Sequence, residues 1–133
     1  MTRTHEKVGY PPAGKARQYT PATAASGVEQ AFKVLEGRWK LVILFHLFGG
    51  KTLRFSELER AIPAISQKML TQQLRQLEKD GMVRRTIHPE VPPRVEYRLT
   101  AWGQALCPAL DALLEWTAGR EVYTGAQLKT GVP

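Results

Sequence analysis

Residues 66–80 alternate between apolar and polar positions with the period of an α-helix. At about 100° per residue, Leu70, Leu74 and Leu77 fall on one side. This pattern predicts a helix that packs on a core through its leucines and exposes a cationic ridge. Ser66 has the residue type of its N-cap, and Asp80-Gly81 ends it. The side opposite the leucines carries no acid and consists of Lys68, Thr71, Gln72, Arg75 and Lys79.

A shorter helix is predicted immediately before this one. Ser56 has the residue type of an N-cap, and Glu59 three residues later completes a capping box. The helix runs to about Ala61, since Pro63 cannot continue it. A short helix, a tight turn and a longer two-faced helix together predict a helix-turn-helix.

Two segments of alternating polarity follow, at residues 83–88 and 94–99. Their apolar residues recur at every second position, as in half-buried strands. The connection between them contains Pro89, Pro92 and Pro93, which cannot donate to a sheet and so favour a stiff projecting loop. These segments predict a small antiparallel β wing beside the helix-turn-helix.

Further helices are predicted on both flanks of this motif. Val28–Leu35 has an apolar stripe, and Trp39–Phe48 is apolar on most of its circumference, so it belongs in the core. Leu53–Phe55 is expected to be extended. Ala101–Gly119 is a long helix that Pro108 should kink or restart. The predicted fold class is mostly α with a small antiparallel β wing: a winged helix-turn-helix with N- and C-terminal dimerisation helices.

The final helix is too apolar for a single core-facing stripe, and a monomer would expose part of it as a patch. We therefore expect a homodimer. The residues expected to form its interface are Leu106, Leu110, Leu113 and Trp116.

Composition separates the chain into three regions. Residues 1–25 are rich in Thr, Ala, Pro and Gly and are predicted to be a flexible basic arm. Residues 26–118 form the winged helix-turn-helix domain with its C-terminal dimerisation helix, and residues 119–133 form a tail. The net charge is +7, which favours an anionic partner without identifying it.

We recognise no catalytic or cofactor-binding motif in this sequence. His5, His46 and His88 lie on three separate predicted elements and match no metal-site spacing. We therefore expect no enzyme activity, no metal and no cofactor. Cys107 is the single cysteine, which fits a reducing compartment. The sequence has no apolar signal peptide and no apolar run long enough to span a bilayer. We therefore expect a cytoplasmic protein without membrane contact.

Double-stranded DNA is the partner that the cationic ridge favours, although a plain solvated face remains the alternative. Arginine and lysine can bind guanine edges or phosphates, and glutamine can pair with adenine. Arg94 at the wing suits a phosphate or the narrow minor groove, whereas His88 is as consistent with a solvated tip as with contact. The expected recognition-helix contacts are Ser66, Gln67, Lys68, Thr71, Gln72, Arg75 and Lys79.

Several motifs resemble the HxlR family of bacterial winged-helix regulators, relatives of the MarR type. They are Gly37-Arg38-Trp39-Lys40, Arg54-Phe55-Ser56-Glu57-Leu58, Ile65 to Leu74, Glu78 to Val83 and Pro92 to Thr100. The resemblance covers about residues 26–118. It implies a homodimer that binds a pseudo-palindromic operator and acts as a transcriptional repressor or activator. It also implies, for many members, a response to electrophiles, oxidants or small molecules, so a small-molecule effector is a candidate partner.

One position departs from the redox-sensing members that the sequence resembles. Those members carry a cysteine just before the first helix, where this chain has Ser26-Gly27. Cys107 lies instead among apolar residues of the last helix, where a small buried hydrophobe is the expected role. The rival hypothesis for the whole chain is a winged-helix module that binds protein and does not read DNA.

Overall fold

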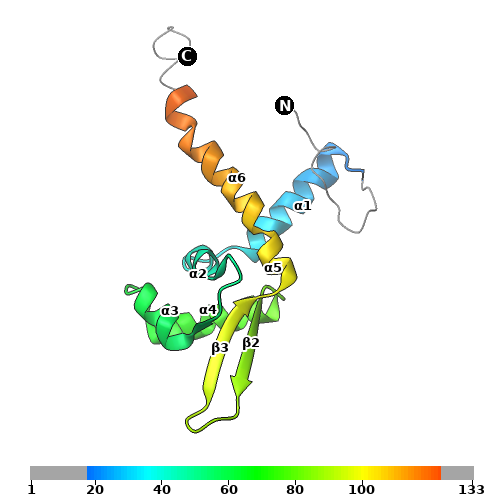
Figure 1. The fold of residues 1–133 in the computed structure, drawn as a ribbon. Helices are drawn as coiled ribbons and strands as arrows, with labels where there is room; N and C mark the ends of the chain where they lie inside the picture. Colours follow the sequence, from blue (N-terminus) through cyan, green and yellow to red (C-terminus); the bar gives the residue numbers. More distant parts are fainter. Residues whose placement is uncertain (1–17, 124–133) are drawn as a thin grey trace. The chain divides into compact units, whose positions relative to one another are not determined.

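The computed structural model describes residues 18–123 and divides the chain between Glu36 and Gly37 into two units, each considered by itself (Figure 1). The first unit contains α1 (Pro21–Val34). The second contains the remaining elements in the order α2 (Lys40–Leu47), β1 (Leu53–Arg54), α3 (Phe55–Ala61), α4 (Gln67–Lys79), β2 (Val83–His88), β3 (Arg94–Leu99), α5 (Ala101–Ala105) and α6 (Cys107–Ala118).

Helix α1 begins at Pro21, seven residues before the predicted start at Val28. The Thr20 hydroxyl accepts a hydrogen bond from the Thr23 amide at 3.1 Å, and the Thr23 hydroxyl accepts one from the Thr20 amide at 2.9 Å. Pro21 stands in the first turn, where its missing amide costs nothing. The prediction of a flexible arm is therefore wrong for residues 21–25, and residues 1–17 lie outside the described part. Ser26 lies inside α1, not before it.

The core of the second unit is built where α2 meets the two helices of the helix-turn-helix. Predicted helix α2 is confirmed to within a residue at each end, and its Ile43, Leu44 and Leu47 are fully buried. Helix α4 contributes the predicted leucine face: Leu70 and Leu77 are fully buried, and Leu74 nearly so. Since these leucines are fixed in the core, the orientation of the opposite side of α4 is fixed as well.

The three strands form one antiparallel sheet in the order β1-β3-β2. Val83 pairs with Leu99 at one end of the hairpin, and His88 pairs with Arg94 at the other. We call the side of the sheet nearer α4 the inner sheet face; it carries Leu53, Val83, Arg85, Ile87, Val95, Tyr97 and Leu99. The outer sheet face carries Arg54, Arg84, Thr86, His88, Arg94, Glu96 and Arg98.

The predicted long C-terminal helix is two helices, as its proline suggested. Helix α5 ends at Ala105 and α6 starts at Cys107, with Pro108 in the first turn of α6. Gly103 in α5 lies against the backbone carbonyl of Met82, where a side chain would clash. This close approach fixes α5 against the start of the wing. Helical structure continues at residues 120–123, beyond the predicted boundary at residue 118.

The N-terminus of α3 lies two residues earlier than predicted. Ser56 is not its N-cap; Arg54 takes that position, and the Glu57 Oε1 atom accepts a hydrogen bond from the Arg54 amide at 2.7 Å. Glu57 therefore does what was predicted for Glu59. Within residues 18–123, no helix is long and apolar enough to cross a membrane.

Candidate nucleic-acid interface

The exposed side of α4 carries the cations that the sequence placed there. Lys68, Gln72, Arg75 and Lys79 are all exposed, and Thr71 is half-buried. Within residues 18–123, the side chains of Lys68, Gln72 and Lys79 have no hydrogen-bond or ion-pair partner. Nothing in the described chain competes for these donors. We call Lys68, Gln72, Arg75 and Lys79 the α4 ridge.

The first turn of α4 uses its polar side chains for folding. The Ser66 hydroxyl accepts a hydrogen bond from the Met69 amide at 3.0 Å, which confirms the predicted N-cap. The Thr71 hydroxyl donates to the Gln67 carbonyl at 2.9 Å. These bonds occupy the acceptor of Ser66 and the donor of Thr71. Gln67 remains exposed at the start of the helix.

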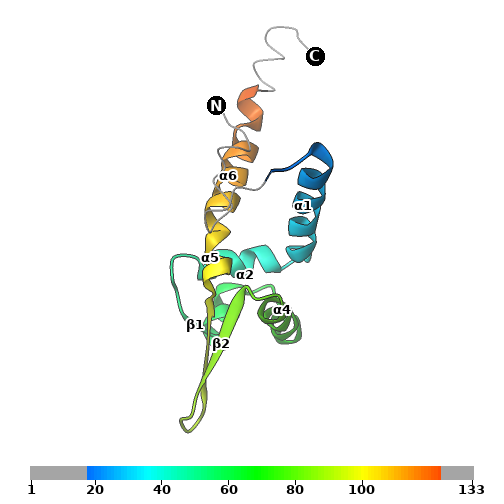
Figure 2. The ribbon, with the colours of Figure 1, turned by 90° about the vertical axis from the view of Figure 1, so that its right-hand side faces the viewer.

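Helix α4 and the wing are joined through the inner sheet face. Arg85 Nε lies 3.5 Å from Glu78 Oε1, between β2 and α4. Burial raises the pKa of the Tyr97 hydroxyl, which also interacts electrostatically with Arg85, Glu78 and Arg75. Figure 2 shows the sheet edge-on with α4 on one side of it. The ridge and the wing therefore hold a defined relative position.

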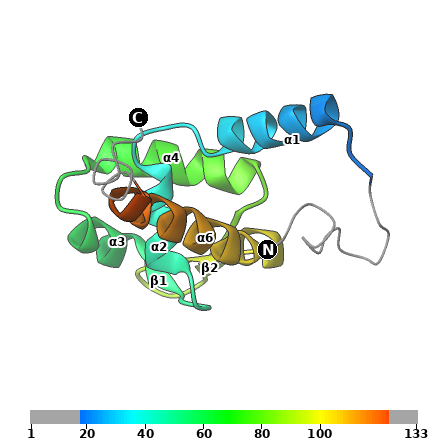
Figure 3. The same cartoon turned by 90° about the horizontal axis from the view of Figure 1, so that it is seen from above.

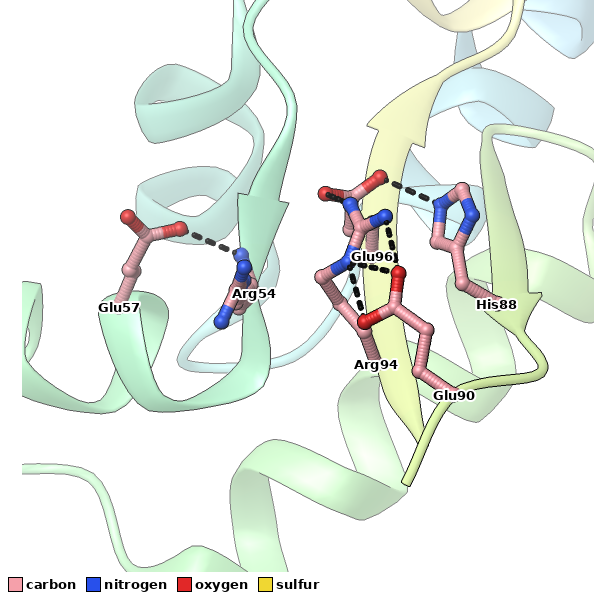
Figure 4. A network of polar contacts seen from close by, with 6 residues as sticks. All are labelled: Arg54, Glu57, His88, Glu90, Arg94 and Glu96. Carbon is pink, nitrogen blue, oxygen red and sulfur yellow. Dashed lines mark hydrogen bonds and ion pairs between the residues drawn. The ribbon is translucent and has the colours of Figure 1, made fainter. Parts of the chain in front are cut away.

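The wing tip holds a compact ion-pair network (Figure 4). The Arg94 guanidinium donates from Nη2 to Glu90 Oε2 at 2.8 Å and from Nη1 to Glu96 Oε2 at 2.7 Å. His88 Nε2 lies 2.8 Å from the other oxygen of Glu96. The two cationic wing residues named from the sequence thus come together, but around carboxylates that no sequence pattern had indicated as their partners.

The network shifts the ionisation of its members in a consistent direction. The hydrogen bond from Arg94 holds the pKa of Glu90 below its ordinary value. The bond with His88, followed by that from Arg94, lowers the pKa of Glu96. Both carboxylates raise the pKa of Arg94 in return. Both acids are therefore charged at neutral pH and offset the positive charge of Arg94.

The apolar positions of α6 divide into buried and exposed sets. Leu110 is buried within the single chain at 6% exposure, and Leu106 is half-buried. Leu113 and Trp116 are exposed at 45% and 76%. Of the four predicted interface residues, Leu110 is therefore already buried in the single chain, and the composition of the dimer interface stays a prediction. Exposed apolar residues that the prediction omitted are Trp102, Leu114, Val122 and Tyr123.

Cys107 is half-buried at the start of α6, not fully buried as expected, but its surroundings disfavour the reactive thiolate. Burial first, and then the Asp111 carboxylate, raise the pKa of the Cys107 thiol. Its Sγ atom lies 3.9 Å from Asp111 Oδ2, and a neighbouring anion disfavours the thiolate. Within the described residues there is also no cluster of three or more His, Cys, Asp or Glu side chains that could hold a metal ion.

Comparison with known proteins agrees with this geometry. The HxlR-like helix-turn-helix family matches residues 34–123. An HTH-type transcriptional regulator of Methanothermobacter thermautotrophicus is 54% identical over 89 residues, 67% of each chain. The regulator YtcD of Bacillus subtilis is 53% identical over 91 residues, 68% of this chain and 71% of its own.

Solved structures show the same winged helix-turn-helix. The redox regulator HypR in its reduced form superposes with a TM-score of 0.66 at 42% identity, covering 74% of this chain and 98% of HypR. With the family match and the curated relatives, this similarity makes the assignment plain. The chain belongs to the HxlR-like helix-turn-helix family of DNA-binding transcriptional regulators.

Proposed function

We propose that the protein binds a pseudo-palindromic operator as a homodimer, with one α4 ridge in each of two successive major grooves. The observation that carries this proposal is the α4 ridge itself, an exposed set of three cations and one amide without an acid. A major groove accepts one α-helix, and its base edges offer acceptors to such donors. Two copies related by a two-fold axis would read half-sites about 10 bp apart.

Within the ridge, residue type sets the division of roles. Lys68, Gln72 and Arg75 recur one helical turn apart, so they line up along the groove. Arg75 and Lys68 suit guanine edges or phosphates, and Gln72 suits adenine. Lys79, at the far end of the helix, suits a phosphate. Ser66 and Gln67 lie near the N-terminus of α4, where amides and hydroxyls bind backbone phosphates. Because the Thr71 hydroxyl already donates to the Gln67 carbonyl, Thr71 suits contact with a thymine methyl group.

The wing takes a secondary role in this proposal. His88 and Arg94 remain candidate contacts to the flanking backbone. Their partners Glu90 and Glu96 reduce the positive charge that a phosphate would meet. We therefore assign most of the operator affinity to α4 and a smaller, sequence-independent share to the wing tip.

Dimerisation is supported by exposed apolar surface on the terminal helices. Leu113, Leu114 and Trp116 of α6 are exposed in the single chain, as are Val28 and Phe32 of α1. Val28 and Phe32 are four residues apart, so they share one side of α1. A second copy would cover such surfaces, which monomeric proteins rarely leave open. A cytoplasmic location follows from the proposed partner, since the protein must have access to operator DNA.

An oxidant or small-molecule response remains part of the proposal, because HypR is a redox regulator. The surroundings of Cys107 argue that this thiol is not the sensor. The effector and its site would then be different from those of cysteine-based sensors.

Selection of bound fragments from random-sequence DNA tests the proposal most economically. The expected result is one enriched pseudo-palindrome whose half-sites are about one helical turn apart. No enrichment, together with equal affinity for all duplexes, would favour the alternative that the fold serves as a protein-interaction module. The absence of acid on the α4 ridge argues against that alternative, because protein-binding surfaces more often mix apolar residues or both charge signs.

A further inference from the structure

The outer sheet face carries two arginines that the α4 proposal does not use. Arg84 on β2 and Arg98 on β3 are cross-strand partners in the register of the hairpin. Both are exposed. Directly opposite residues in an antiparallel pair have Cβ atoms about 4.5–5.5 Å apart. The two arginine side chains therefore extend from the same side of the sheet and are direct neighbours.

No acid offsets this pair. Within residues 18–123, neither Arg84 nor Arg98 forms a side-chain hydrogen bond or an ion pair. Glu96 shares the outer sheet face, but its two oxygens are already bound to His88 and Arg94. Arg85, by contrast, lies on the inner sheet face and pairs with Glu78. Arg84 and Arg98 are thus an uncompensated pair.

Folding alone gives no reason for this pair. Like charges directly opposite each other destabilise a strand pair, and a threonine at either position would suit a strand better. An anion bound between the two guanidiniums would offset the repulsion. The forked donors of arginine match a phosphate group in geometry as well as in charge.

The position of the pair indicates where such phosphates come from. Figures 2 and 3 show α4 on one side of the sheet, and among the helices of residues 37–123 none covers the other side. The hairpin projects past α4 (Figure 1). Arg84 and Arg98 are the second pair from the end of the hairpin that joins α4 and α5, so they lie at the base of the wing and not at its projecting tip. The backbone of a duplex that lies along the α4 ridge and continues past the wing is the source of phosphate nearest to this position.

We propose that Arg84 and Arg98 bind backbone phosphates of the duplex that flanks the operator, outside the half-site read by α4. This inference rests on the proposed function and adds a second DNA-binding surface to it. Arg54 lies on the outer sheet face opposite Glu96 and is exposed, so it extends the positive surface across β1. The outer sheet face reads no bases, and it draws the flanking duplex toward the wing.

The test compares two duplexes for each variant. One is the selected operator alone, and the other adds about one helical turn of arbitrary sequence, roughly 10 bp, at each end. Fluorescence anisotropy at several salt concentrations gives affinity and salt slope. Wild type should bind the long duplex more tightly. The Arg84→Gln/Arg98→Gln double variant should lack that advantage, and its slope on the long duplex should fall by about 0.9 for each phosphate that it no longer neutralises.

Arg85→Gln is the matched control for the single variant Arg84→Gln, which should lose part of the advantage, because each removes one positive charge and the two positions are neighbours on opposite sheet faces. Arg85→Gln should keep the advantage of the long duplex. Equal losses of affinity on both duplexes in the double variant, or no loss on either, would overturn the inference. Failure of wild type to bind the operator alone would instead remove the proposed function. The double variant should also melt no lower than wild type, and a large drop in Tm would make the pair structural.

Discussion

The cations of α4 and those of the wing tip illustrate two uses of the same charge. Lys68 and Lys79 on the α4 ridge are exposed and have no partner among residues 18–123. Arg94 at the wing tip donates to two carboxylates at 2.7–2.8 Å. A free cation is available to a phosphate or base, whereas a paired one must first exchange its partner. A basic residue near a DNA-binding motif is therefore informative only together with its neighbours.

The largest effect is expected from a variant that disrupts the dimer, because the contacts of α4 and of the wing tip with the operator are then weakened together. Leu113→Glu would place a charge in the proposed α6 interface, where an unpaired buried charge costs on the order of 3–5 kcal/mol. Dimer and operator affinity should fall together, because two half-sites act through effective concentration. Light scattering and anisotropy would measure both, with Leu113→Met as the apolar control. A wild type that is monomeric at micromolar concentration would contradict the dimer.

A smaller effect isolates one base contact of the α4 ridge. Gln72→Ala should weaken operator binding by about 1–3 kcal/mol and relax preference at one base pair, since the variant cannot form the bidentate pair with adenine. Random DNA should be affected much less. Gln30→Ala is the matched control, because Gln30 is an exposed glutamine of α1 and not of the helix that carries the ridge. If the two variants behave alike, Gln72 does not read a base.

Removing an acid from the wing tip should make Arg94 available to DNA, as the cations of the α4 ridge are. Glu90→Gln would release the Nη2 side of Arg94, which now donates to Glu90. Affinity for operator and random DNA should rise equally, with a salt slope steeper by about 0.9 per subunit. Glu115→Gln on α6 is the control, because it makes the same change in net charge. It should change neither the affinity for DNA nor the salt slope. Unchanged binding by Glu90→Gln would mean that Arg94 does not contact DNA even without its ion pair to Glu90.

No effect is expected from the cysteine. Its thiol pKa is raised by burial and by Asp111, so little reactive thiolate forms at neutral pH. Cys107→Ser should retain operator binding and whatever response to oxidants the wild type has, as measured by anisotropy before and after peroxide. Release of DNA from wild type but not from Cys107→Ser would reverse this assignment.

The sequence predicted the elements whose signals are local. The leucine period and Ser66 defined α4, and the alternation of residues 83–88 and 94–99 defined the strands. The start of α1 was missed because Thr20, Pro21 and the alanines after them carry no apolar period. The cap of α3 was misplaced because Ser56-to-Glu59 and Arg54-to-Glu57 have the same spacing, and only the folded backbone distinguishes them.

The ion pairs of the wing cations could not be predicted from local sequence signals. Pairing of Arg94 with Glu90 and Glu96 depends on the conformation of the proline-rich loop and on the register of the hairpin. The same holds for the division of α6 into a buried Leu110 and an exposed Leu113, which requires knowing where α6 packs. Spacing identifies which residues share a side, but tertiary contact decides which of them remain free.

The contrast between free and paired cations is tested by measuring Arg75→Ala beside Arg94→Ala on operator and scrambled duplexes at several salt concentrations. We expect Arg75→Ala to lose about 1–3 kcal/mol on the operator and much less on the scrambled duplex. Arg94→Ala should weaken both equally and only slightly, with a salt slope lower by less than the roughly 0.9 that one fully neutralised phosphate contributes per subunit. An unchanged operator-to-scrambled ratio in Arg75→Ala, or a selective loss of operator affinity in Arg94→Ala, would show that α4 is not the element that reads the operator.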